Sequence, residues 1–115
     1  MKKESCIFIE HILESIKDIE SFTKETSKGA FFKNKEKQNA VVRSLEVIGE
    51  AVKNIPNNLK EKYSYVHWRE IAGTRDKIIH HYFGVDLNIV WDIVKINIPD
   101  LKIKISKIKK DVESG

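Results

Sequence analysis

The sequence predicts an all-α protein, an up-down bundle of four to six helices, and three observations lead to this prediction. Apolar residues recur at helical spacing in several long segments. Only 5 glycines and 2 prolines interrupt the 115 residues, fewer than strands joined by tight turns usually need. Apolar residues make up 41% of the chain and charged residues 33%, which favours a folded domain over a disordered chain. We expect one domain over residues 1–115.

The first expected helix covers about residues 4–27, and Gly29 follows it as a stop. A basic connection at residues 28–37 comes next, in which Phe31 and Phe32 are expected to close the end of the core. The apolar stripe of this first helix consists of Ile9, Ile12, Leu13, Ile16, Ile19 and Phe22.

The second expected helix runs from about residue 35 to residue 55 and is stopped by Pro56. Gly49 lies inside it at a cost of about 1 kcal/mol relative to alanine, which indicates close approach of another helix, from the same chain or a second copy. We therefore expect a homodimer built on this helix and on the region around residues 75–82. Its apolar side chains have heptad-like spacing: Val41, Leu45, Ile48, Val52 and Ile55.

The same helix carries a polar stripe formed by Arg43, Glu46 and Glu50. One interpretation, the more common case, is a solvated face with an ion pair between Arg43 and Glu46, worth a few tenths of a kcal/mol. The other is the polar lining of a site, in which Arg43 and Glu46 would support the reacting groups.

The second half of the chain predicts shorter helices. One is expected at residues 67–71 and another at residues 74–81, with Thr74 as its N-cap. Gly84 permits a turn, and Asp86 can cap the next helix, which Pro99 should kink or restart. A last amphipathic stripe is surrounded by lysines and consists of Leu101, Ile105, Ile108 and Val112.

Charge and composition exclude some classes of protein. The net charge of +4 suits an anionic partner without identifying one. Cys6 is the only cysteine, so no internal disulfide can form, and a reducing compartment fits. Glu4, Glu10 and Glu14 interrupt any signal-like apolar stretch, and no run approaches the roughly 18 apolar residues of a membrane span. We expect a cytoplasmic protein without membrane contacts.

The stretch from Arg75 to Gly84 carries the most chemistry: a permanent cation, imidazoles and a phenol. These groups could cleave RNA without a metal. A histidine with a pKa near neutrality can take the proton of the 2′-hydroxyl, and an arginine fork can hold the charge that develops on the phosphate. DNA lacks that hydroxyl and would not be cut. His80 and His81 are adjacent and no ligand set surrounds them, so no metal site is expected.

Other interpretations of this stretch stay open. The two histidines could complement a helix dipole, and Tyr82 and Phe83 could be core aromatics. On one regular helix Arg75 and His80 would also point about 140° apart, because each residue turns the helix by roughly 100°. They could converge if the helix ends near His80 or if two subunits share the site.

The spacing Arg75-x4-His80-x-Tyr82 resembles the Arg-x4–6-His motif of HEPN domains and, more narrowly, the Arg-x4-His-x-Tyr form of HepT-like toxins. Three longer blocks resemble that family in the same order: AVVRSLEVIGEAVKNIP at 40–56, WREIAGTRDKIIHHYFGVDLNIVWDIV at 68–94 and IPDLK at 98–102.

This resemblance implies a dimeric HEPN bundle with an RNase cleft at its two-fold axis. Arg75 and His80 of each subunit would be catalytic, without a cofactor. Tyr82 would be the residue that a cognate minimal nucleotidyltransferase, the antitoxin, adenylylates with AMP from ATP. His81 occupies the middle position of the motif and leaves open which imidazole faces the cleft.

The sequence therefore favours a metal-independent endoribonuclease, the toxin of a toxin–antitoxin pair, because both Arg75 and His80 are present. The alternative is a non-catalytic helical partner that binds the nucleotidyltransferase and its nucleotide without cutting RNA. A general nucleic-acid-binding module would rest on charge alone.

Overall fold

The computed structural model describes residues 3–80 and 84–114 and confirms an all-α helical bundle. Within the described residues, five α-helices and the π-helical η1 have only five or six residues each, so the chain divides more finely than the expected four to six helices. A pair of two-residue strands, β1 (Ile79–His80) and β2 (Gly84–Val85), lies between α6 and α7. The helices are α1 (Lys3–Thr23), α2 (Lys28–Phe32), α3 (Lys35–Lys53), α4 (Asn57–Lys62), α5 (Trp68–Ala72), α6 (Thr74–Ile78), α7 (Leu87–Asp92), the π-helical η1 (Ile93–Asn97) and α8 (Ile98–Ser114).

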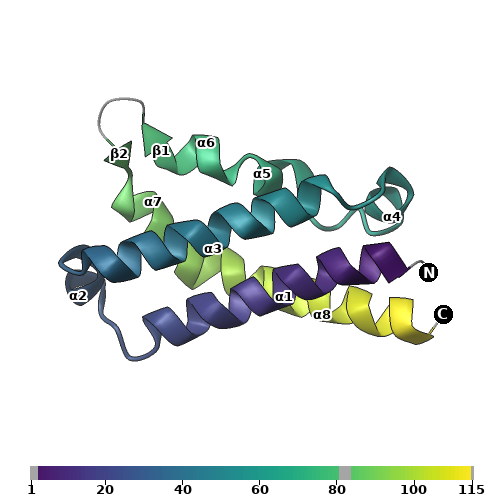
Figure 1. The fold of residues 1–115 in the computed structure, drawn as a ribbon, viewed down its shortest axis with the longest axis horizontal. Helices are drawn as coiled ribbons and strands as arrows, with labels where there is room; N and C mark the ends of the chain where they lie inside the picture. The colour runs from purple at the N-terminus through teal and green to yellow at the C-terminus, as the bar shows by residue number, and fades with distance from the viewer. Residues whose placement is uncertain (1–2, 81–83, 115) are drawn as a thin grey trace.

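The three longest helices give the bundle its up-down arrangement. α1 runs antiparallel to α3 and to α8 and packs against both (Figure 1). The short helices α5 and α6 lie along α3 and run in the opposite direction to it. The chain then returns through β1, β2 and α7 to begin the last helix. This path places α6 beside the middle of α3, far from either end of the chain.

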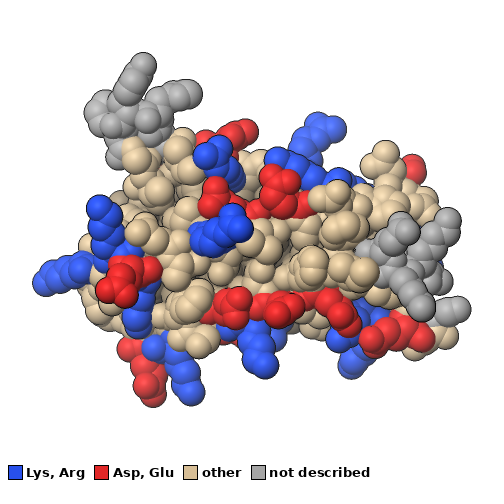
Figure 2. Space-filling view, viewed as in Figure 1, with Lys and Arg blue, Asp and Glu red and all other residues tan. Residues whose placement is uncertain are grey.

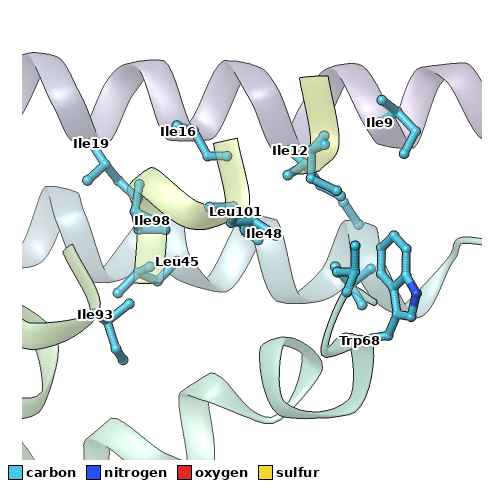
Figure 3. Packing of buried hydrophobic residues seen from close by; sticks show 14 of the residues in the cluster. Ile9, Ile12, Ile16, Ile19, Leu45, Ile48, Trp68, Ile93, Ile98 and Leu101 are labelled. Carbon is cyan, nitrogen blue, oxygen red and sulfur yellow. The ribbon is translucent and has the colours of Figure 1, made fainter. Parts of the chain in front are cut away.

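The core lies between these helices, and each long helix contributes the apolar stripe that its spacing predicted (Figure 3). The apolar stripe of α3 is covered by its own chain, so a second copy could contact this helix only through another face. The buried residues of the three stripes are Ile9, Ile12, Ile16 and Ile19 of α1, Val41, Leu45, Ile48 and Val52 of α3, and Leu101, Ile105, Ile108 and Val112 of α8.

The first turn of the chain differs from the sequence-based expectation. α1 ends at Thr23, because Glu25 adopts a left-handed conformation with φ of 56°. Ser27 then caps α2, accepting a hydrogen bond from the backbone N–H of Ala30 at 3.1 Å. Gly29 therefore lies inside α2 and does not stop α1. Phe31 is fully buried, which confirms its expected place at the end of the core.

Pro99 acts as expected, and the π-helical segment shows how. Proline has no N–H, and its ring crowds the carbonyl four residues before it. The chain widens ahead of it, where the Ile98 N–H donates to the carbonyl of Ile93, five residues back. α8 then restarts at Ile98. Within residues 3–80 and 84–114, no helix combines the length and the apolar character that crossing a membrane requires.

Candidate active site

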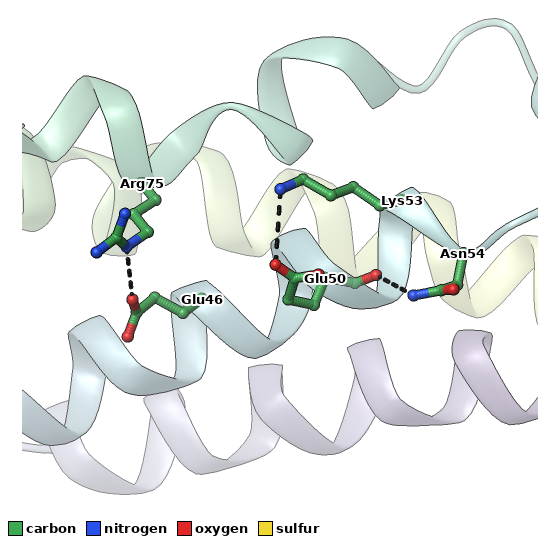
Figure 4. A network of polar contacts seen from close by, with 5 residues as sticks. All are labelled: Glu46, Glu50, Lys53, Asn54 and Arg75. Atoms are coloured by element: carbon green, nitrogen blue, oxygen red, sulfur yellow. Dashed lines mark hydrogen bonds and ion pairs between the residues drawn. The ribbon is translucent and has the colours of Figure 1, made fainter.

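Arg75 lies on α6 and faces α3. Its Nε donates a hydrogen bond to Oε2 of Glu46 at 2.9 Å, and the two side chains also form an ion pair (Figure 4). The arginine side chain is 63% exposed, whereas that of Glu46 is 28% exposed. The guanidinium is therefore tethered at one nitrogen while most of it remains in contact with solvent.

Near this ion pair, α5 approaches α3 at Gly49. A Cβ on Gly49 would lie 3.5 Å from the backbone oxygens of Ile71 and Ala72 at the end of α5. The two chain segments run antiparallel. Glu46 and Arg75 are therefore each three residues, about one helical turn, away from this close approach. Of the two partners that the sequence left open for Gly49, the same chain supplies the neighbour.

A recess of about 290 Å³ adjoins the ion pair. Arg43 has no ion pair or hydrogen bond among the described residues, because Glu46 pairs with Arg75. The expected ion pair between Arg43 and Glu46 is therefore wrong, whereas the role of the polar stripe as the lining of a site stays a prediction. The charged residues that line the recess are Arg43, Glu46, Glu50, Lys53, Arg75 and Asp76.

Two of these lining residues were missed in the sequence. Lys53 continues the stripe of Glu46 and Glu50 at helical spacing, and its Nζ lies 3.6 Å from Oε1 of Glu50. That spacing could have identified it. Asp76 follows Arg75 directly in the chain, and only the packing of α6 against α3 brings it to the recess.

The helix that carries Arg75 is shorter than expected. α6 ends at Ile78, and Ile79 is extended, with φ of −101° and ψ of 119°. Ile79 pairs with Val85 across the two short strands, and His80 pairs with Gly84, whose φ is +76°. The expected helix to residue 81 is therefore wrong. Adjacent β-branched residues favour the extended conformation over the helix, and glycine accepts a positive φ without strain.

Of the two N-caps expected next to this segment, that of α6 is not formed and that of α7 is. Thr74 is the first residue of α6 and not its N-cap; its hydroxyl donates to the backbone oxygen of Glu70 at 3.3 Å. Asp86 caps α7 as expected, accepting from the N–H of Ile89 at 3.1 Å. The Asp86 N–H also donates to the Ile78 oxygen at 2.7 Å, which ties the start of α7 to the end of α6.

The helix end changes the geometry of the predicted motif. Arg75 lies on a helix and the backbone of His80 lies in a strand, so the 140° divergence of a single regular helix does not apply. His81 and Tyr82 lie outside the described residues, as does the side chain of His80. Within the part of the chain that the structure describes, no three His, Cys, Asp or Glu side chains are grouped so that they could hold a metal ion.

The guanidinium of Arg75 is the chemically best-defined group of this site. A guanidinium has five N–H donors, and only the one on Nε has a partner among the described residues. The two terminal nitrogens can bind an anion through two parallel hydrogen bonds, the geometry that a phosphate group prefers.

Comparison with known proteins agrees with this description. Residues 12–108 match the model of the family described as "Ribonuclease HepT-like". The chain is 48% identical over 110 residues to "Probable ribonuclease HepT" of Thermococcus cleftensis, covering 96% of this chain and 100% of that protein. It is 49% identical over 112 residues to "Putative RNase MJ0127" of Methanocaldococcus jannaschii, covering 97% and 93%.

A longer relative shows that this unit also occurs within a larger protein. The whole chain is 47% identical to "Gamma-glutamylcyclotransferase and putative RNase MJ0434" of Methanocaldococcus jannaschii, and it spans about half, 52%, of that protein's length. No solved structure gives a significant match. The match of residues 12–108 to the family model, with relatives nearly half identical along their length, shows that this chain belongs to the HepT-like ribonuclease family.

Proposed function

We propose that this protein is a metal-independent endoribonuclease in which Arg75 binds the phosphate under attack and His80 transfers the proton. The single observation that carries the proposal is the position of Arg75: an exposed guanidinium, tethered only through Nε, at the edge of a recess. Membership of the HepT-like ribonuclease family supports RNA as the substrate.

The reaction follows from these groups. The 2′-hydroxyl loses its proton to an imidazole and attacks the adjacent phosphorus, while the bond from phosphorus to the 5′-oxygen of the next nucleotide breaks. Negative charge grows on the non-bridging oxygens, where the terminal nitrogens of Arg75 donate hydrogen bonds. A protonated imidazole returns the proton to the leaving oxygen. The products are a 2′,3′-cyclic phosphate and a free 5′-hydroxyl.

A second copy of the chain is part of the proposal, because one chain supplies only one Arg75–His80 pair. The buried stripe of α3 is closed to a partner, so the two copies would meet at the exposed edge formed by α3 and α6. Such a homodimer would place two pairs around one phosphate.

Control of the nuclease is the remaining part. We propose that the protein is the toxin of a toxin–antitoxin pair and that a minimal nucleotidyltransferase adenylylates Tyr82. An added AMP would bring a bulky base and a negative phosphate beside the cleft, so that RNA is repelled and blocked without any change to Arg75 or His80. Intact-mass and peptide mass spectrometry after co-expression would detect the added AMP, and Tyr82→Phe should abolish it.

The direct test of the nuclease is cleavage of RNA by purified protein that is unmodified at Tyr82. Arg75→Ala and His80→Ala should each lower the rate by roughly 10²-fold or more. EDTA should have no effect, and an RNA with 2′-deoxy substitution at the cleavage site should stay intact. Full activity of His80→Ala, or loss of activity in EDTA, would refute this mechanism; a dead His81→Ala with an active His80→Ala would move the role to the neighbouring imidazole. RNA left intact by the wild type would favour the non-catalytic alternative.

A further inference from the structure

We infer that Glu46 is a positioning residue for the nuclease, which acts by holding the Arg75 guanidinium in the orientation that binds phosphate. The inference rests on the proposed function and extends it to a carboxylate that does not itself touch RNA. The observation behind it is a hydrogen bond of 2.9 Å between Arg75 Nε and Glu46 Oε2.

The choice of nitrogen matters. A carboxylate that gripped both terminal nitrogens would compete with the phosphate for the same fork. Glu46 engages Nε alone, so the edge formed by the two terminal nitrogens remains open. Phosphate can then bind end-on while the carboxylate stays in place, and the arginine has no need to exchange one anion for the other.

The surroundings of the pair support a positioning role. The arginine side chain is 63% exposed, so without a tether it would sample many rotamers. Glu46 is held more firmly, with 28% of its side chain exposed, on a helix whose opposite face is in the core. The close approach of α3 and α5 at Gly49, one turn away, fixes the spacing of the two backbones.

The same recess provides a matched control. Glu50 lies one turn further along α3, lines the same recess and pairs with Lys53 of its own helix at 3.6 Å. It contributes the same charge to the recess as Glu46 but has no bond to Arg75 among the described contacts. A general effect of negative charge on RNA binding would therefore appear in variants of both residues.

The test is steady-state cleavage of an RNA oligonucleotide by the full chain and its Glu46→Ala, Glu46→Gln and Glu50→Ala variants. Glu46→Ala should lower kcat on the order of tenfold with little change in KM, because a misplaced Arg75 fails mainly in the transition state. Glu46→Gln keeps an oxygen that accepts from Nε and should stay within about threefold of the wild type. Glu50→Ala removes the same charge from the recess but no contact of Arg75, so it should lower kcat clearly less than Glu46→Ala does. An unchanged or faster Glu46→Ala, or equal losses in Glu46→Ala and Glu50→Ala, would overturn the inference.

A spectroscopic measurement separates this inference from the proposed nuclease. The Nε–H resonance of Arg75, assigned by its loss in Arg75→Lys, should be sharp and slow to exchange in the wild type and in Glu46→Gln. It should broaden and exchange faster in Glu46→Ala. An equally sharp signal in Glu46→Ala would overturn the positioning role whatever the cleavage assay gives. Normal RNA cleavage by Arg75→Ala would refute the proposed role of Arg75 in the reaction, and RNA left intact by the wild type would refute the proposed nuclease, even with the Nε–H signal behaving as expected.

Discussion

The ion pairs Lys102–Glu20 and Arg75–Glu46 have the same shortest distance, 2.9 Å, and differ in how many N–H donors they leave without a partner. Lys102 of α8 donates to both carboxylate oxygens of Glu20 on α1, at 3.1 and 2.9 Å. Arg75 of α6 donates to one oxygen of Glu46 on α3 through Nε alone. An ammonium has three donors and a guanidinium five, so among residues 3–80 and 84–114 Lys102 keeps one N–H without a partner and Arg75 keeps four.

The two ion pairs also differ in the charged residues that surround them. Lys109 approaches Glu10 at 3.9 Å, so a second lysine of α8 also faces an acidic residue of α1. Figure 2 shows acidic side chains in a row across the lower part of the visible face, with basic side chains next to them. A lysine-rich helix is thus partly neutralised by its neighbour. Net charge alone therefore does not locate the RNA-binding surface that we propose, and the proposal depends instead on the geometry of one arginine.

The largest effect on stability should come from the buried apolar side chains of α8, which packs against α1. Ile105 is fully buried, and Ile105→Ala should lower the free energy of unfolding by about 2–5 kcal/mol. Chemical denaturation measures this loss. A change below about 1 kcal/mol would mean that the contact between α1 and α8 depends on its ion pairs and not on its buried apolar side chains.

A smaller loss is expected where α3 begins. Asn34 caps this helix, its side chain accepting from the Lys37 N–H at 3.0 Å. Asn34→Ala should cost about 1 kcal/mol, measured by the same denaturation. RNA cleavage by the folded fraction should not change, because Glu46 lies three turns further along the helix. A drop in the cleavage rate of the folded protein would show that the start of α3 positions the site.

The Lys102–Glu20 pair should contribute less still. Both side chains are about half exposed, 50% and 44%, so solvent screens their attraction. Lys102→Ala should change the free energy of unfolding by about 0–1 kcal/mol, and the remaining difference should shrink further in high salt. A loss above about 2 kcal/mol would mean that this exposed ion pair stabilises the contact between α1 and α8 more than exposed ion pairs usually do.

Gly49→Ala should have the smallest effect. The added methyl group would lie 3.5 Å from the two carbonyl oxygens of α5, an ordinary contact, and alanine favours the helix. The midpoint of thermal unfolding should stay the same or rise slightly, and the cleavage rate should not change. A marked loss of either would mean that α3 and α5 pack more tightly than these distances indicate.

Much of the fold could be predicted from the sequence, because periodicity directly reports which face of a helix is buried. The stripes of Ile12, Ile48 and Ile105 are examples, since each lies where its spacing placed it. The helix ends were less predictable. Glu25 has no sequence preference that marks it as the left-handed residue, and the end of α6 at Ile78 depends on the pairing of Ile79 with Val85.

The residues of the site also divide into those that could be predicted from the sequence and those that could not. Arg75 could be found from its motif, because the spacing to His80 lies within a few residues of chain. Its partner could not, since Glu46 is 29 residues away and a within-helix pair with Arg43 was the more common interpretation of the spacing. Only the packing of α6 against α3 decides between the two, and that packing is a property of the folded bundle.

The central claim, that Arg75 and not overall positive charge drives RNA cleavage, is tested most directly by comparing single-turnover cleavage by Arg75→Ala and Lys102→Ala. Each variant removes one cation from a 2.9 Å ion pair with a glutamate. We expect Arg75→Ala to be slower by roughly 10²-fold and Lys102→Ala to stay within about twofold of the wild type. Equal losses in the two variants, or an active Arg75→Ala, would contradict the claim.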